Sequence, residues 1–145
     1  IPYRTKNRFS VKTIYLRKRN EKNNTRSMKP TFICYPKCST CAKAAKWLAA
    51  HGIETDTRDI VADRPSRDEL SEWLSRSGLP VRKLFNTSGL RYKELNLKER
   101  IPASSDSELL DLLATDGKLV KRPVLVWDGG VLFGFREEEW AKALR

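Results

Sequence analysis

The sequence has no long run of apolar residues. No stretch approaches the length of about 18 residues at which a transmembrane helix is suspected, and the mean hydropathy is -0.58. This excludes a membrane-spanning helix. The basic N-terminus is not followed by the apolar segment and small-residue cleavage site of a secretory signal. We therefore expect a cytoplasmic protein with no membrane partner.

Cysteine is scarce and confined to one segment. The chain has three cysteines, Cys34, Cys38 and Cys41. Such a cluster cannot build a disulfide framework, because nothing further along the chain could pair with it. The pattern is typical of a reducing compartment and of a local chemical role.

Histidine is scarcer still, and this bears on metal binding. A closed structural zinc site needs four ligands. Beside Cys38 and Cys41, the candidates are Cys34, inside a predicted strand, and the single histidine, His51. His51 falls at the far end of a predicted helix, roughly 15–20 Å from Cys38 at 1.5 Å per residue. We expect no metal, a core-packing role for Cys34 and an exposed His51.

Acidic residues are almost absent from the N-terminal segment. Residues 1–27 hold nine of the 29 Lys and Arg and one of the 18 acidic residues, and so carry +8 of the net +11. The remainder is nearly balanced, which argues against direct nucleic-acid binding by the core. We interpret residues 1–27 as a basic extension outside the fold, with Met28 as the natural start, and residues 28–145 as one domain. The alternative is a basic arm for nucleic acid or a partner.

Organised sequence begins just after Met28, with a predicted β-α-β unit. Thr31–Tyr35 reads as a buried strand, Ser39–His51 as a helix and Glu54–Ile60 as a second, parallel strand. The residues expected on the inward face of the helix are Cys38, Cys41, Ala42, Ala45, Leu48 and Ala49.

The middle of the chain is predicted to be helical. Ser66 with Glu69 and Ser105 with Glu108 form capping boxes that mark two helix starts. The expected helices are Ser66–Arg76, Val81–Phe85, ambiguously Leu90–Glu99, and one that starts at Ser105 and closes at Asp116-Gly117.

The last third predicts a hairpin and a closing helix. Val124–Trp127 and Val131–Phe133 are the expected strands, joined by a tight turn, and Arg136–Leu144 is the expected helix. The order β-α-β, helices, β-β-α is that of an α/β protein with a thioredoxin-like fold, enlarged by a helical insertion between its halves. Three tryptophans are expected to pack rather than to bind, namely Trp47, Trp73 and Trp140.

A Cys-x-x-Cys motif lies between the first strand and the first helix. Cys38 precedes the helix, where unpaired N–H groups and the helix dipole stabilise a thiolate, and Lys37 adds positive charge. A thiol with a lowered pKa is the reactive kind, so we predict that Cys38 is the nucleophile. Cys41, one turn further along, suits a resolving thiol. The alternative is a pair of inert buried cysteines.

Three segments resemble the glutaredoxin-like arsenate reductase and Spx family. They are Tyr35–Ala44, Gly78–Asn86 and Lys121–Val126, the last ahead of Gly134. The resemblance implies a thioredoxin fold in which Pro123 is cis and faces the cysteine loop, so that Arg122 lies near Cys38 and holds an oxyanion or the thiolate. The alternative for Arg122 is a solvated surface arginine.

The resemblance also suggests what the site binds. A thiol or oxyanion substrate would meet Cys38, with Lys37, Ser39, Thr40 and Pro123 as its binding surroundings. No bound cofactor is implied. The co-substrate would be a thiol reductant such as glutathione with glutaredoxin, or thioredoxin.

Two functions remain open within this resemblance. Arsenate reductases of the family use three arginines, of which this chain matches one, Arg122. Asn86 stands at the second position, and at the third Arg136 is adjacent to the expected place, so arsenate should react poorly. The first function is a thiol–disulfide oxidoreductase. The second is an Spx-like redox-sensing regulator that binds the RNA polymerase α subunit.

Overall fold

The computed structural model describes residues 29–144 of the chain, so the predictions for residues 1–27 lie outside the described residues. None of its helices has the length and apolar character that crossing a bilayer requires. The strands and α-helices are β1 Thr31–Cys34, α1 Ser39–Ala50, β2 Asp56–Asp59, α2 Arg67–Ser77, α3 Leu90–Glu94, α4 Leu97–Arg100, α5 Asp106–Leu113, β3 Val124–Trp127, β4 Gly130–Phe133 and α6 Glu137–Ala143. Three short 3-10 helices complete the list: η2 Val81–Leu84, η3 Ile101–Ala103 and η4 Gly117–Leu119.

The four strands form one mixed sheet in the order β2-β1-β3-β4. Strand β1 pairs parallel with β2, as the β-α-β unit predicts, and antiparallel with β3. Strands β3 and β4 form the predicted hairpin, in which Trp127 pairs with Gly130. The turn is therefore one residue shorter than expected, because Gly130 already belongs to β4.

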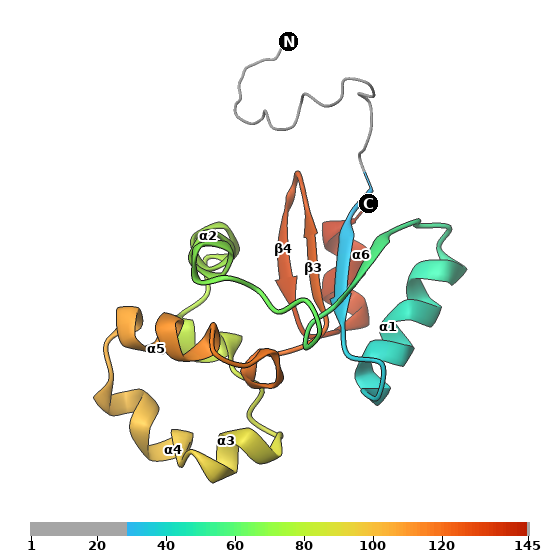
Figure 1. The fold of residues 1–145 in the computed structure, drawn as a ribbon. Helices are drawn as coiled ribbons and strands as arrows, with labels where there is room; N and C mark the ends of the chain where they lie inside the picture. Colours follow the sequence, from blue (N-terminus) through green and yellow to red (C-terminus); the bar gives the residue numbers. More distant parts are fainter. Residues whose placement is uncertain (1–28, 145) are drawn as a thin grey trace.

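Helices cover both faces of the sheet, and each face has its own hydrophobic cluster (Figure 1). Alternate strand side chains point to opposite faces: Phe32 and Leu125 pack with α1 and α6, whereas Ile33 and Val124 pack with α2 and α5. This is a thioredoxin-like fold with helices inserted between its two halves, as predicted.

Helix α1 buries Cys41 and Leu48 as predicted, but the rest of its buried face differs from the prediction. Its buried residues are Cys41, Ala44, Trp47 and Leu48. The expected inward residues Ala42, Ala45 and Ala49 are exposed. The reason is that alanines occur on every side of this helix, so the large Trp47 side chain, which packs edge-on against Trp140 of α6, decides the rotation. Trp47, Trp73 and Trp140 are buried, as expected.

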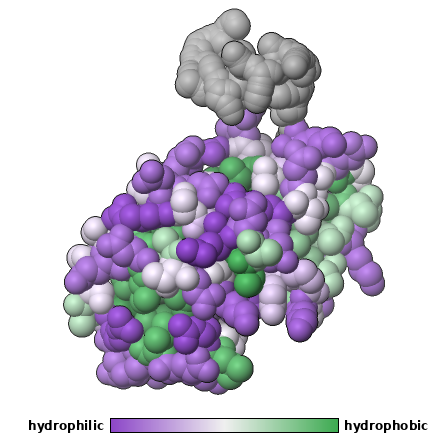
Figure 2. All heavy atoms as spheres, in the orientation of Figure 1, coloured by the Kyte–Doolittle hydropathy of each residue, from purple (hydrophilic) through white to green (hydrophobic). Residues whose placement is uncertain are grey.

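The helical insertion begins and ends where local chemistry dictates. Both predicted capping boxes are present, at Ser66 and Ser105, and Gly78 ends α2 in the left-handed conformation. The ambiguous segment 90–99 forms two short helices, separated by Asn96, which also has a positive φ. Figure 2 shows a mostly polar face with an apolar area at its lower left, where α3 to α5 lie.

A short backbone ladder joins the end of η2 to the segment around Val120, between η4 and β3. Phe85 bridges Val120 in antiparallel fashion. The N–H of Asn86 donates to the carbonyl of Leu119 at 2.8 Å, and the N–H of Lys121 donates to that of Leu84 at 2.7 Å. The ladder therefore fixes Asn86 and Lys121 in one rigid frame beside the end of β1.

Candidate functional site

Cys38 is the N-cap residue of α1, as its place in the sequence predicts. The backbone N–H groups of Cys41 and Thr40, the Cys41 thiol and the Arg122 guanidinium lie near its sulfur as donors and favour the thiolate. Burial, the largest single influence, raises the pKa of Cys38, but these four donors together outweigh it. The pKa of Cys38 is therefore lowered from the ordinary 9.0.

Cys41 has the opposite character. It is buried, and the N–H of Tyr35 donates to its sulfur at 3.4 Å. Burial raises the pKa of Cys41 to about 12, and the neighbouring Cys38 adds to the effect. Two thiols that hydrogen-bond to each other are thus held in different states: Cys38 tends toward thiolate while Cys41 keeps its proton.

Cys34 lies at the end of β1, half-buried against the cluster that α1 and α6 form with the sheet. Burial raises the pKa of Cys34, followed by the charges of Asp59 and Cys38. It is therefore held protonated, in keeping with the packing role expected from the sequence.

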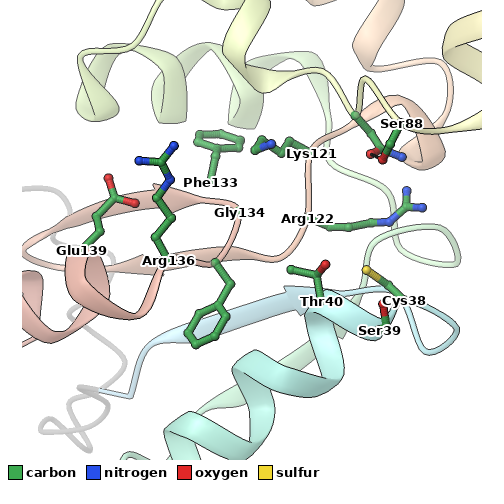
Figure 3. Close-up of a pocket in the computed structure, with 12 residues that line it drawn as sticks. Cys38, Ser39, Thr40, Ser88, Lys121, Arg122, Phe133, Gly134, Arg136 and Glu139 are labelled. Atoms are coloured by element: carbon green, nitrogen blue, oxygen red, sulfur yellow. Dashed lines mark hydrogen bonds between the residues drawn. The ribbon is translucent and has the colours of Figure 1, made fainter.

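Arg122 lies just before β3, and its guanidinium extends beside the loop that carries Cys38 (Figure 3). The peptide bond between Arg122 and Pro123 is cis, as the family resemblance implies. The guanidinium lies 5.0 Å from the centre of the Tyr35 ring. It also donates to the carbonyl of Lys118 at 3.2 Å. Arg122 is therefore held by several contacts and is not a freely solvated arginine.

The sulfur of Cys38 opens onto a cleft of about 340 Å³ whose walls come from three parts of the chain (Figure 3). The start of α1 forms one wall, the loop after η2 another, and the residues on either side of the hairpin the third. The lining residues are Cys38, Ser39, Thr40, Asn86, Ser88, Lys121, Arg122, Phe133, Gly134, Phe135, Arg136 and Glu139.

The cleft brings together some of the residues singled out in the sequence and leaves others aside. Cys38, Ser39, Thr40 and Arg122 line it. Cys41 and Pro123 are buried next to it, and Lys37 is exposed outside its lining. The binding roles of these residues stay predictions.

Asn86, at the second position of the family's arginine set, lines the cleft, and so does Arg136, which is adjacent to the expected third position. Their roles stay predictions. Three polar lining residues were not singled out as site residues from the sequence: Ser88, Lys121 and Glu139. The adjacent Arg-Pro pair could have drawn attention to Lys121. No other cue was available, because the cleft forms only when distant segments meet.

No group of three or more His, Cys, Asp or Glu within residues 29–144 is arranged to hold a metal ion. His51 is exposed and stacks on the Trp47 ring, with ring centres 4.0 Å apart. The polar groups that line the cleft are a thiol, hydroxyls, an amide, a carboxylate and three cations.

Comparison with known proteins places this arrangement in a family. Residues 34–143 match the ArsC family. The chain belongs to the ArsC family. The membership predicted from the cysteine loop and the Arg-Pro segment is thus confirmed, and the match spans both halves of the fold and the helices between them.

Relatives within the ArsC family carry different descriptions. The chain is 48% identical to the uncharacterized protein YusI of Bacillus subtilis over 78% of this chain and 96% of YusI. It is 35% identical to the regulatory protein MgsR of the same organism, over 77% of this chain and 87% of MgsR. A crystal structure of a putative ArsC family related protein from Bacteroides fragilis has a TM-score of 0.78 at 52% identity, and covers 81% of this chain and 99% of its own.

Proposed function

We propose that this ArsC-family protein is a thiol–disulfide oxidoreductase in which Cys38 is the nucleophile and Cys41 the resolving thiol. The observation that carries the proposal is the placing of Cys38 at the start of α1, on a cationic cleft, with a buried thiol hydrogen-bonded to it. The thiolate is the nucleophilic form of cysteine, and the helix N–H donors with Arg122 favour that form at Cys38.

The reaction has two exchange steps. The Cys38 thiolate attacks one sulfur of a substrate disulfide, forming a mixed disulfide and releasing the other sulfur as a thiolate. Cys41 then loses its proton to the released thiolate or to water and attacks the Cys38 sulfur. The second substrate thiol leaves, and a Cys38–Cys41 disulfide remains. The substrate is reduced by two electrons and the protein pair is oxidised by two.

A thiol reductant completes the cycle. Glutathione with glutaredoxin, or thioredoxin, would reduce the Cys38–Cys41 disulfide by the same exchange chemistry. The open cleft beside Cys38 supports access for a small thiol or for the active-site loop of a protein thiol.

Alkylation and oxidation of the full chain test the assignment. Limited alkylation near neutral pH, followed by mass spectrometry, should label Cys38 ahead of Cys41 and Cys34. Mild oxidation should produce a Cys38–Cys41 disulfide. Cys38→Ser should abolish the early labelling, while Cys41→Ser should keep it and accumulate mixed disulfides, because the resolving step is lost.

Cys34→Ser is the matched control, since it removes the third thiol of the same segment. It should leave labelling and disulfide formation unchanged. Earlier labelling of Cys34 or Cys41 than of Cys38 would show that the nucleophile is assigned to the wrong residue.

A second candidate function is that of a redox-switched regulator. It is supported by the 35% identity to the regulatory protein MgsR. In that case oxidation of the same cysteine pair would alter binding to a protein partner, for which the RNA polymerase α subunit is the candidate. Turnover separates the two: an oxidoreductase consumes reductant continuously with a disulfide substrate, whereas a regulator is oxidised once and stops.

A further inference from the structure

Lys121 has an unusual support in the cleft. Its backbone is fixed by the hydrogen bond to Leu84, and its side chain lies over Gly134. A Cβ atom on Gly134 would lie 2.7 Å from Cε of Lys121 and 3.8 Å from its Nζ, so the end of the lysine side chain lies directly over the glycine. Gly134 therefore makes the space in which the lysine stem rests.

Gly134 is itself held in place. It has a φ of +80°, a conformation that favours glycine. Its N–H donates to the carbonyl of Pro123 at 2.8 Å, and its carbonyl accepts from the indole N–H of the fully buried Trp140 at 3.1 Å. The support under Lys121 is thus built from both the cis-proline segment and the closing helix.

The cations of the cleft divide into two kinds. Arg122 is engaged with the Cys38 sulfur, the Tyr35 ring and a backbone carbonyl. Lys121 and Arg136 make no ion pair or side-chain hydrogen bond with any residue of 29–144, although Glu139 lines the same cleft. Of these two, Arg136 is exposed, whereas Lys121 is half-buried (Figure 3).

We infer that Lys121 is a specificity-determining residue that binds a carboxylate of the disulfide substrate while Cys38 attacks the sulfur. The inference rests on the proposed function and adds a substrate class, disulfides that carry a negative charge near the sulfur–sulfur bond. An ammonium with no partner in the protein is free to pair with an anion. Because Lys121 and Cys38 line the same cleft, the anion would be held within that cleft while Cys38 attacks.

Two aromatic disulfides of different charge serve as probes. Dithiobis-nitrobenzoate carries a carboxylate on each ring, whereas dithiodipyridine is neutral at pH 8. In the Cys41→Ser background, Cys38 attacks one sulfur, a Cys38–probe disulfide forms, and one coloured thiol leaves. The rate of colour release therefore measures the first exchange step alone. In that step the attacking Cys38 thiolate is the only reductant that the probe needs.

Lys121→Gln should slow the reaction with the carboxylate probe by about three- to tenfold, the loss of one charge-assisted contact. It should leave the neutral probe unchanged. Lys121→Arg should keep most of the preference because the charge stays.

Lys118→Gln is the matched control. It removes the same charge from the exposed residue three positions earlier, which does not line the cleft. Equal slowing by Lys118→Gln, or equal slowing of both probes by Lys121→Gln, would overturn the inference. If Cys38→Ser leaves the reaction intact with both probes, the proposed function itself fails, which is a separate result.

Discussion

Gly117 is the glycine at which an added methyl group should destabilise the fold around the site most, because it would meet the closest neighbouring atom. It is buried at the start of η4 and packs against the chain just after β2. A Cβ atom there would lie 1.8 Å from the carbonyl oxygen of Ile60 and 2.7 Å from its carbon. Both are backbone atoms, so no side-chain rotation can relieve the overlap. Contacts below 3.0 Å essentially never occur, so η4 would have to move by about an ångström.

Gly117→Ala should therefore cost about 3 kcal/mol, the upper part of the range for overpacking. For a chain of this size the loss corresponds to a drop of roughly 10 °C in Tm. Urea unfolding monitored by tryptophan fluorescence gives the free energy, and thermal unfolding gives Tm. Because η4 carries the Lys118 carbonyl that accepts from Arg122, alkylation of Cys38 should slow as well.

Gly130→Ala is the control for this change. The nearest atoms to a Cβ on Gly130 are 3.5 Å away, an ordinary contact, and its φ is not in the positive range. It should alter stability by no more than about 1 kcal/mol. A Gly117→Ala protein within about 1 kcal/mol of the Gly130→Ala protein would refute the reasoning, because the backbone would then have absorbed the methyl group freely.

Four further results are expected. Arg122→Gln should raise the pKa of Cys38, so the pH midpoint of its alkylation should move upward from a value below 9.0; an unchanged midpoint would remove Arg122 from the site. The unfolded thiol of Cys41 ionises near pH 9.0 and the folded one near 12, so stability should fall as pH rises between these values, and Cys41→Ser should lessen that fall in urea titrations. Ser66→Ala should cost about 1 kcal/mol by removing the N-cap of α2, as measured by urea unfolding. Arsenate should turn over poorly with glutathione and glutaredoxin, and robust turnover would mean that Lys121 or Arg136 supplies the missing contacts.

Local signals in the sequence predicted the parts of the fold that local chemistry controls. The capping boxes at Ser66 and Ser105 and the helix-ending Gly78 depend on neighbours within a few residues, so they could be recognised directly. The position of Cys38 before α1 is local in the same sense. The division of segment 90–99 was missed because Asn96 adopts a left-handed conformation that its sequence context does not require.

Properties that depend on tertiary contacts could not be obtained in this way. The inward face of α1 is set by Trp47 meeting Trp140, residues almost a hundred positions apart. Lys121 enters the cleft through the ladder with Leu84 and the space above Gly134. Arg82 lies in the family-like segment Gly78–Asn86, yet it lines a different hollow with Pro80 and Asp106, away from Cys38.

The pairing register of β1 has a consequence for how activity can be lost. Phe32 and Ile33 point to opposite layers and pair with Leu125 and Val124. A slip of one residue would exchange the side chains between the two layers. It would also shift β1, and with it the loop that carries Cys38, by about 3.3 Å relative to Arg122. Substitutions in β1 that shift its register should therefore inactivate the protein, although they lie outside the cleft. Such variants would be inactive although Cys38, Cys41 and Arg122 are all still present.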